Sequence, residues 1–538
     1  MLKGIGASQG YGIGKAVVIH SVSTDYSNIK YTNAENEKNK LSIAIDSYIT
    51  ETKKLAENVK KTAGEKEAEI FEGHIVMLSD PFMLGQMQEN IDAGSAAVKA
   101  VDTVCQMFID MFSGVEDELT RQRASDVKDI RDSLLQKLMG VKAVDIGKVP
   151  PNSVLIADDF TPSMTGKIKK ENVCAIITET GGITSHSAIL ARAMGIPAVL
   201  SVTDATNIIK DGEMLICDGF KGKVLLDINE NDIIKYTELQ NQYLAQKESL
   251  KNYIGKETIT AKGIQKAVYA NIGKPEDVQN VLQNSGEGIG LFRTEFLFMD
   301  RSSQPTEDEQ FEAYSTVAKA MNGKEVIIRT LDIGGDKNIP YLSIKKEENP
   351  FLGYRAIRYC LDNKSLFKRQ IRAVLRAAAY GNIKIMLPLI TCLDEIYQAK
   401  KIIKECEDEL TAEKKEHKSV ALGVMIETPA AAFISDLLAK EVDFFSIGTN
   451  DLTGYIMAVD RGNSKVIGLY DTFQSAVLRA IEMTIKNAKT AGIQVGMCGE
   501  AAADTKMIPM LLEWGLDEFS VSPNSILQTR KTICECEY

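Results

Sequence analysis

The C-terminal half of the chain contains eight short apolar runs that alternate with helical segments, and this alternation constrains the fold more than any other feature. Buried parallel strands are almost continuously apolar, and eight successive strand–helix units are typical of a (β/α)8, or TIM, barrel. The sequence therefore predicts such a barrel over residues 257–538. Its strands are expected in KAVYANI, GIGLFRTE, EVIIRTLD, IKIMLPLI, ALGVMIET, DFFSIGTND, IQVGMCGE and LDEFSVSP.

Polar residues stand at the end of nearly every one of these runs. In a (β/α)8 barrel the strand ends and the loops after them form the active site. We therefore expect most of these residues to line one site, while some form structural ion pairs. The rim residues are Asn271, Arg293, Glu295, Arg329, Asp332, Glu427, Asn450, Asp451, Cys498 and Glu500.

The rim combines fixed positive charge with carboxylates. Guanidinium groups hold anions, and carboxylate oxygens are ligands for a hard divalent cation. Mg²⁺ takes one or two protein carboxylates, which Glu427 and Asp451 provide, and leaves its other positions to substrate and water. The rim thus favours a phosphate-bearing substrate with magnesium. Its cations are Arg293, Arg329, Lys337, Arg355 and Arg461.

The first half of the chain shows three other patterns. Residues 21–144 repeat apolar side chains at steps of three and four, which predicts a helical bundle. Residues 145–228 hold short β-rich runs between Gly and Asp, which predicts a compact α/β domain. The polar segment 229–256 is typical of a linker helix. The glycine-rich start, 1–20, predicts a strand and turns.

His186 stands in GGITSHSAILAR, where a helix is expected to begin. Thr184 or Ser185 is a suitable N-cap, and two glycines before them permit a tight turn. The backbone N–H groups at a helix start stabilise added negative charge, so a phosphorylated imidazole is favoured here. On spacing alone, a structural histidine remains the alternative. A metal site is less favoured, because no ligand set is evident with His20, His74 and His417.

Composition excludes several classes of function. The 74 acidic and 63 basic residues give a net charge of −11, which argues against a nucleic-acid binder and suits a basic protein partner. No window approaches the roughly 18 uncharged apolar residues of a membrane helix, and the start lacks the pattern of a signal peptide. We therefore expect a cytoplasmic protein without membrane insertion. The nine cysteines form no CxxC pair and are expected to be reduced.

Several motifs resemble those of one family. GGITSHSAILARAMGIPAVL resembles the phosphohistidine signature of phosphoenolpyruvate-utilising enzymes. The chain is identified as a member of the enzyme I family, the phosphoenolpyruvate–protein phosphotransferases of the bacterial sugar phosphotransferase system. The barrel motifs that carry this resemblance are GIGLFRTEFLFMDR, TLDIGGDK, NPFLGYRAIR, SIGTNDLTGYIMAVDR and GMCGEAAAD.

The resemblance implies a domain plan and a reaction. Residues 21–144 would be a carrier-binding subdomain inserted into a phosphohistidine domain made of 1–20 and 145–228. His186 would take the phosphoryl group of phosphoenolpyruvate and pass it to HPr, the small carrier of the family. The barrel would also form a homodimer. Because the histidine and the barrel belong to different domains, the phosphohistidine domain would swing about the linker 229–256.

The resemblance also implies a role for each matching residue. Glu427 and Asp451 would bind Mg²⁺, Cys498 would protonate the enolate of pyruvate, and Thr165 would orient the ring of His186. The phosphate and carboxylate of phosphoenolpyruvate would be held by Arg293, Arg329, Lys337, Arg355, Asn450, Asp451 and Arg461.

Three positions depart from the family pattern. Ile183 stands where the family usually has arginine, and Gly454 and Ile456 replace glutamine and threonine. These changes leave open a specialised paralogue that serves another carrier. Two further alternatives are a nucleotide-dependent enzyme of the synthase or dikinase kind and a scaffold that has lost turnover.

Overall fold

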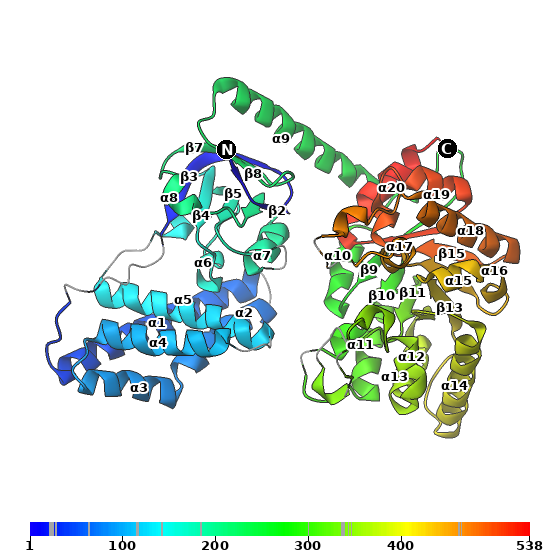
Figure 1. Cartoon of the computed structure of the whole chain (residues 1–538), viewed down its shortest axis with the longest axis horizontal. Helices are drawn as coiled ribbons and strands as arrows, with labels where there is room; N and C mark the ends of the chain where they lie inside the picture. Colours follow the sequence, from blue (N-terminus) through cyan, green and yellow to red (C-terminus); the bar gives the residue numbers. More distant parts are fainter. Residues whose placement is uncertain are drawn as a thin grey trace. The chain divides into compact units, whose positions relative to one another are not determined.

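The structure of the chain is a computed structural model that divides into two compact units, Met1–Gln246 and Lys247–Tyr538 (Figure 1). It describes the backbone of His186 but not its side chain. Within the described residues, no helix combines the length and the apolar content that a membrane crossing requires. The described residues are 1–20, 26, 29–62, 65–114, 118–140, 144–182, 185–299, 301–334, 339–342, 344–345, 347–460, 463 and 465–537.

The first unit contains an eight-stranded sheet with the strand order β1-β8-β7-β3-β4-β5-β6-β2. The central strands β3 to β6 are parallel, and the outer strands pair antiparallel. Successive residues of β4 belong to two different apolar clusters, so both faces of the sheet are covered. The strands are β1 (Leu2–Lys3), β2 (Ile5–Ser8), β3 (Tyr11–Ile19), β4 (Ser153–Ala157), β5 (Val173–Thr178), β6 (Ala198–Leu200), β7 (Met214–Asp218) and β8 (Lys223–Leu225).

A helical bundle is inserted between β3 and β4, which are paired neighbours in the sheet. Its apolar core includes two buried series that recur at the predicted steps of three and four, namely Val98, Val101 and Val104, and Val127, Ile130 and Leu134. The predicted α/β fold with an inserted bundle is therefore confirmed. The bundle helices are α1 (Ala34–Thr62), α2 (Glu65–Leu78), α3 (Pro81–Asp92), α4 (Ala97–Ser113) and α5 (Glu118–Met139).

Four helices follow the bundle in the first part of the chain. The predicted phosphohistidine motif runs into α7, and α9 lies within the segment predicted as a linker helix. The domain limits themselves stay a prediction. The four are α6 (Pro162–Thr165), α7 (His186–Met194), α8 (Ala205–Ile208) and α9 (Glu230–Leu250).

The second unit is a closed barrel of eight parallel strands in sequence order, with β16 pairing β9. Each of the eight predicted runs contains one strand, so the predicted (β/α)8 barrel is confirmed. The strands are β9 (Ala267–Ile272), β10 (Ile289–Phe292), β11 (Val326–Arg329), β12 (Ile383–Leu387), β13 (Ala421–Ile426), β14 (Phe444–Ile447), β15 (Gln494–Met497) and β16 (Glu518–Val521).

Helices follow the strands and bury their apolar faces on the barrel. Several are short, and α15 and α16 divide one strand–helix connection between them. The helices are α10 (Val278–Gln283), α11 (Glu307–Ala320), α12 (Ile357–Asp362), α13 (Lys364–Ala377), α14 (Leu393–Ala412), α15 (Pro429–Phe433), α16 (Ser435–Leu438), α17 (Thr449–Met457), α18 (Ser475–Ala491), α19 (Ile508–Trp514) and α20 (Ile526–Glu535).

Glu518 of β16 is a buried carboxylate inside the barrel wall. Its side chain fills space left by glycine, since a Cβ on Gly496 would lie 1.7 Å from its Oε2. Burial, and then the charge of Glu325, raise the pKa of Glu518 well above its ordinary value, although Lys384 opposes the shift. Lys384 is committed to Glu325, with 2.6 Å between Nζ and Oε2. The folded state therefore favours the protonated form of Glu518.

We expect Glu518→Gln to stabilise the barrel at alkaline pH. Because the folded pKa is raised, the contribution of Glu518 is fully present below its unfolded pKa and is lost as pH rises towards the folded pKa. The variant lacks this loss, so its advantage over the wild type should grow from pH 5 to pH 8. Urea unfolding at pH 5 and pH 8 measures the difference. The exposed Glu513→Gln is the control, and equal pH slopes in both variants would contradict the expectation.

Candidate active site

A cavity of about 410 Å³ opens at the carboxyl ends of the barrel strands. Most of its lining residues lie at the end of a strand or shortly after one, because parallel strands bring their ends to one rim. Of the rim residues predicted from sequence, Asn271 and Glu500 are not among the lining residues, but each contacts one of them: Asn271 donates to the carbonyl of Cys498, and the N–H of Glu500 donates to Asn450 Oδ1 at 3.1 Å. Those that line it are Arg293, Glu295, Arg329, Asp332, Glu427, Asn450, Asp451 and Cys498, joined by Arg355.

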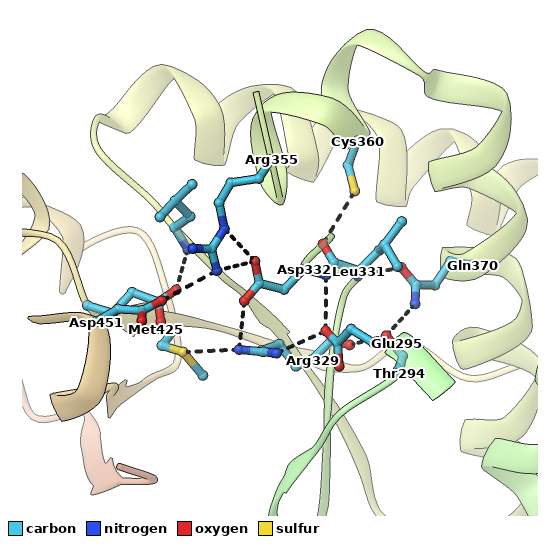
Figure 2. Close-up of polar contacts among 12 residues, drawn as sticks. Thr294, Glu295, Arg329, Leu331, Asp332, Arg355, Cys360, Gln370, Met425 and Asp451 are labelled. Carbon is cyan, nitrogen blue, oxygen red and sulfur yellow. Dashed lines mark hydrogen bonds and ion pairs between the residues drawn. The ribbon is translucent and has the colours of Figure 1, made fainter. Parts of the chain in front are cut away.

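Two arginines are oriented by carboxylates in this cavity (Figure 2). Arg329 donates from Nη2 to Glu295 Oε1 at 2.9 Å, and its Nη1 lies 3.0 Å from Asp332 Oδ2. Arg355 donates from Nε and Nη2 to Asp332 Oδ1 at 3.0 and 2.7 Å. Its Nη2 also reaches Asp451 Oδ2 at 3.4 Å. The two positive charges are thus held in place before a substrate arrives.

A buried glutamine fixes the backbone that carries Arg329. Gln370 of α13 accepts the N–H of Leu331 at 2.9 Å and donates to Thr294 Oγ1 at 3.1 Å. Thr294 in turn donates to the carbonyl of Arg329 at 3.0 Å. The ends of β10 and β11 are therefore tied to the same helix, which fixes the backbone from which Arg329 projects.

Three carboxylates lie close together in the cavity. Glu427 is buried and accepts the N–H of Leu389 at 2.7 Å. Burial, followed by the charges of Asp332 and Asp451, raises the pKa of Glu427 to about 8. A divalent cation bound by Glu427 and Asp451 would relieve this repulsion. In the described part of the chain no three His, Cys, Asp or Glu side chains form a metal site, so substrate and water would complete the coordination.

Cys498 lies at the inner end of the cavity. Asn271 Nδ2 donates to its carbonyl at 2.9 Å, and its own N–H donates to Ile447 O at 3.1 Å. Its side chain belongs to an apolar layer with Met425 and Phe444. Burial raises the pKa of the Cys498 thiol to about 12, so the thiol keeps its proton at neutral pH. A protonated thiol at this place can serve as an acid.

His186 and Thr165 belong to the first unit, apart in sequence from the cavity residues. His186 is the first residue of α7, and Ser185 caps this helix by accepting the N–H of Ala188 at 3.3 Å. The predicted helix start is therefore confirmed, with Ser185 as the cap. Thr165 is buried at the end of α6, which contacts α7.

Three predicted positions lie outside the described residues, namely Lys337, Arg461 and Ile183. Six residues that line the cavity were not predicted from the sequence, namely Leu291, Met299, Phe351, Met425, Gly448 and Gly499. Met425 points inward from an apolar strand, where nothing in the sequence separates it from core. Phe351 places its ring 5.8 Å from the guanidinium carbon of Arg355, and its position within NPFLGYRAIR was the available signal.

Comparison with known proteins decides the family. Three domain families of phosphoenolpyruvate-utilising enzymes match: the PEP-binding domain over residues 247–538, the N-terminal domain over 3–123 and the mobile domain over 149–222. Over 534 residues, 99% of this chain, it is 44% identical to the phosphoenolpyruvate-protein phosphotransferases of Priestia megaterium and Bacillus subtilis (strain 168), covering 93% and 94% of those proteins. The chain belongs to the phosphoenolpyruvate-protein phosphotransferase family.

Membership in the phosphoenolpyruvate-protein phosphotransferase family makes the chain an enzyme, as the sequence predicts. A solution structure of an enzyme I protein is also similar, at 33% identity and a TM-score of 0.40. It covers 45% of this chain and 99% of that one. The residue roles inferred above stay predictions.

Gly499, next to Cys498, allows the loop after β15 to approach the start of α17 closely. A Cβ on Gly499 would lie 1.9 Å from Thr449 Oγ1 and 2.6 Å from its backbone nitrogen. Thr449 begins α17, whose first turn carries Asn450 and Asp451.

Gly499→Ala should therefore displace the first turn of α17 and destabilise the barrel by about 1–3 kcal/mol. We expect turnover to fall at least tenfold, since small displacements of positioning groups are costly. Kinetics and urea unfolding measure both effects. Gly468→Ala is the control because a Cβ there meets open space. Similar behaviour of the two variants would refute this account of Gly499.

Proposed function

We propose that the chain transfers the phosphoryl group of phosphoenolpyruvate to its own His186, releases pyruvate, and passes the group to a histidine of HPr, the first step of sugar uptake. The observation that carries this proposal is the barrel cavity, which is lined together by the oriented Arg329 and Arg355, by Glu427 and Asp451, and by Cys498. It pairs anion-binding groups with cation ligands and an acid.

The cavity residues suggest how phosphoenolpyruvate is held. Mg²⁺ on Glu427 and Asp451 would neutralise phosphoryl oxygens as charge develops on them. The phosphate and carboxylate of phosphoenolpyruvate would be held by Arg293, Arg329, Arg355 and Asn450, together with Lys337 and Arg461.

The transfer itself is an in-line displacement. A ring nitrogen of neutral His186, oriented by Thr165, forms a bond to phosphorus while the bond to the enolate oxygen breaks. The methylene carbon of the enolate then takes the proton of the Cys498 thiol, which gives pyruvate. The thiolate recovers its proton from water. The raised pKa of Cys498 supports this role, because an acid must hold its proton until the enolate forms.

The reaction requires His186 to reach the barrel and then the carrier, and α9 is the proposed pivot. Gln240 of α9 donates to Tyr11 O at 2.6 Å and so ties the helix to the first unit. Tyr253, just after α9, is tied to the barrel because its carbonyl accepts from Arg530 at 3.1 Å. The pivot is therefore proposed between Gln240 and Tyr253. Equal small-angle scattering with and without phosphoenolpyruvate and Mg²⁺ would contradict it.

The carrier, the dimer and the cytoplasmic location also belong to this proposal. Exposed apolar side chains on the bundle, Val76, Phe82, Met107 and Met111, and the acidic net charge support docking of a basic carrier. A homodimer through the barrel is supported by the exposed Leu352, Phe433 and Leu469.

The test is transfer of ³²P from phosphoenolpyruvate to the purified protein with Mg²⁺, without nucleotide, in the presence and absence of HPr. Acid-labile label that is absent from His186→Ala and moves to HPr is the expected result. Label that HPr does not remove would indicate a paralogue with another carrier. Labelling that requires ATP would favour a synthase-like or dikinase-like enzyme and refute the proposal.

A further inference from the structure

The short helix that carries Thr165 is fastened to the helical bundle by a buried carboxylate. Asp129 of α5 is 3% exposed. Its Oδ1 accepts from Ser163 Oγ at 2.6 Å, and its Oδ2 accepts the backbone N–H of Ser163 at 3.1 Å. Ser163 lies in α6, two residues before Thr165. The two hydrogen bonds, one to the side chain and one to the backbone of Ser163, hold α6 against α5.

Asp129 also lies close to side chains from two other helices of the bundle, α1 and α2. His74 of α2 is fully buried, and its Nδ1 lies 3.9 Å from Asp129 Oδ2 and 3.1 Å from the hydroxyl of Tyr48 on α1. The other ring nitrogen of His74, Nε2, lies 3.3 Å from Asp126 Oδ1. Side chains from α1, α2 and α5 thus converge behind the carboxylate that holds α6.

The segment held by Asp129 also holds the first turn of α7. Ser187, buried directly after His186, donates from Oγ to Asp159 Oδ1 at 2.8 Å. The same oxygen accepts the N–H of Phe160 at 2.8 Å, so Asp159 is rigid at the start of the segment that continues into α6. The segment is therefore pinned to α7 at one end and to the bundle at the other.

We propose that Asp129 is a positioning residue for the phosphohistidine: by holding Ser163, it sets the place of Thr165 and of the α7 turn that begins at His186. This inference rests on the proposed function and concerns a residue of the helical bundle, outside the cavity proposed for phosphoenolpyruvate. Groups that orient a reacting side chain through another residue typically change activity ten- to a hundredfold when removed.

The network also joins the phosphohistidine to the face proposed for the carrier. His74 and Val76 lie two residues apart on α2. The side chain of His74 is buried next to Asp129, whereas the side chain of Val76 is 70% exposed. A carrier that packs on Val76 therefore contacts α2, the helix whose buried His74 lies next to Asp129. The positioning of His186 is thereby linked to the docking face by consecutive contacts within one unit.

The experiment compares the full-length protein with Asp129→Ala, Asp129→Asn and Ser163→Ala in single-turnover labelling by phosphoenolpyruvate. Asp102→Ala is the matched control, because Asp102 is a carboxylate of the same bundle that contacts Tyr26 and Arg131. We expect Asp129→Ala to lower the maximal rate roughly tenfold or more. The half-saturating phosphoenolpyruvate concentration should stay within about twofold, since its cavity lies in the barrel. Asp129→Asn, which keeps one acceptor oxygen, should recover part of the rate.

A second readout is the ¹⁵N spectrum of the His186 ring in the unphosphorylated protein. Asp129→Ala and Ser163→Ala should shift the ring resonances, whereas Asp102→Ala should not. A maximal rate equal to that of Asp102→Ala, or unchanged ring resonances, would overturn the inference. Should Asp129→Ala not fold, Ser163→Ala decides by the same criteria. A wild-type protein that phosphoenolpyruvate does not label refutes the proposed function alone, and the ring spectra still decide the role of Asp129.

Discussion

Replacing Arg329 with alanine is expected to lower the rate of self-phosphorylation by phosphoenolpyruvate by roughly 10³-fold or more. Burial disfavours the charge of Arg329, but Glu295 and Asp332 outweigh burial and raise its pKa above the ordinary value. The guanidinium therefore stays charged, and its contacts with Glu295 and Asp332 hold its orientation. The variant leaves two carboxylates in the cavity without their shared cation, so the site repels the phosphate that it should bind.

Two matched variants separate charge from geometry at this position. Arg329→Lys restores the charge but not the planar fork, so it should recover only part of the lost rate. Arg358→Ala removes an arginine that donates to the carbonyls of Leu352 and Gly353 instead of lining the cavity, and it should stay near the wild-type rate. Single-turnover labelling measures all three. An Arg329→Ala rate within tenfold of wild type would exclude the proposed phosphate contact.

Replacing Arg530 with alanine should destabilise the barrel by about 3–5 kcal/mol. Arg530 of α20 is fully buried. It donates to Thr258 Oγ1 at 3.1 Å and to the carbonyls of Tyr253, Asn284 and Ser285 at 3.1, 3.4 and 2.7 Å. Its removal leaves a cavity and strips a donor from each of these acceptors.

Urea unfolding of the full-length protein measures this loss, followed by a probe in the barrel such as the fluorescence of Trp514. The control is Arg479→Ala, a substitution of the same kind on the exposed side of α18, which should change stability by less than about 0.5 kcal/mol. Because two units can unfold separately, the barrel transition is the quantity to compare. Equal midpoints for both variants would show that Arg530 does not hold the C-terminal helix in place.

The largest structural features of the chain could be predicted from local sequence patterns. The eight barrel strands were predictable because burial on both faces demands continuous apolar runs, which leave a strong signal in sequence. The rim residues followed from the same signal, since each polar side chain that ends such a run must lie at one edge of the barrel. The helix start at His186 was predictable because capping depends on neighbouring residues alone.

The side-chain contacts within the cavity and around Asp129 depend on segments that are distant in the sequence. The sequence by itself determined the barrel, the helical bundle and the residue types at the rim. Only the tertiary structure decided that Asp332 orients both Arg329 and Arg355, that Met425 lines the cavity, and that Asp129 holds the turn of Thr165. The physical reason is that these interactions pair side chains far apart in the chain, whose geometry depends on how whole strands and helices pack. No periodicity or local motif records such a pairing.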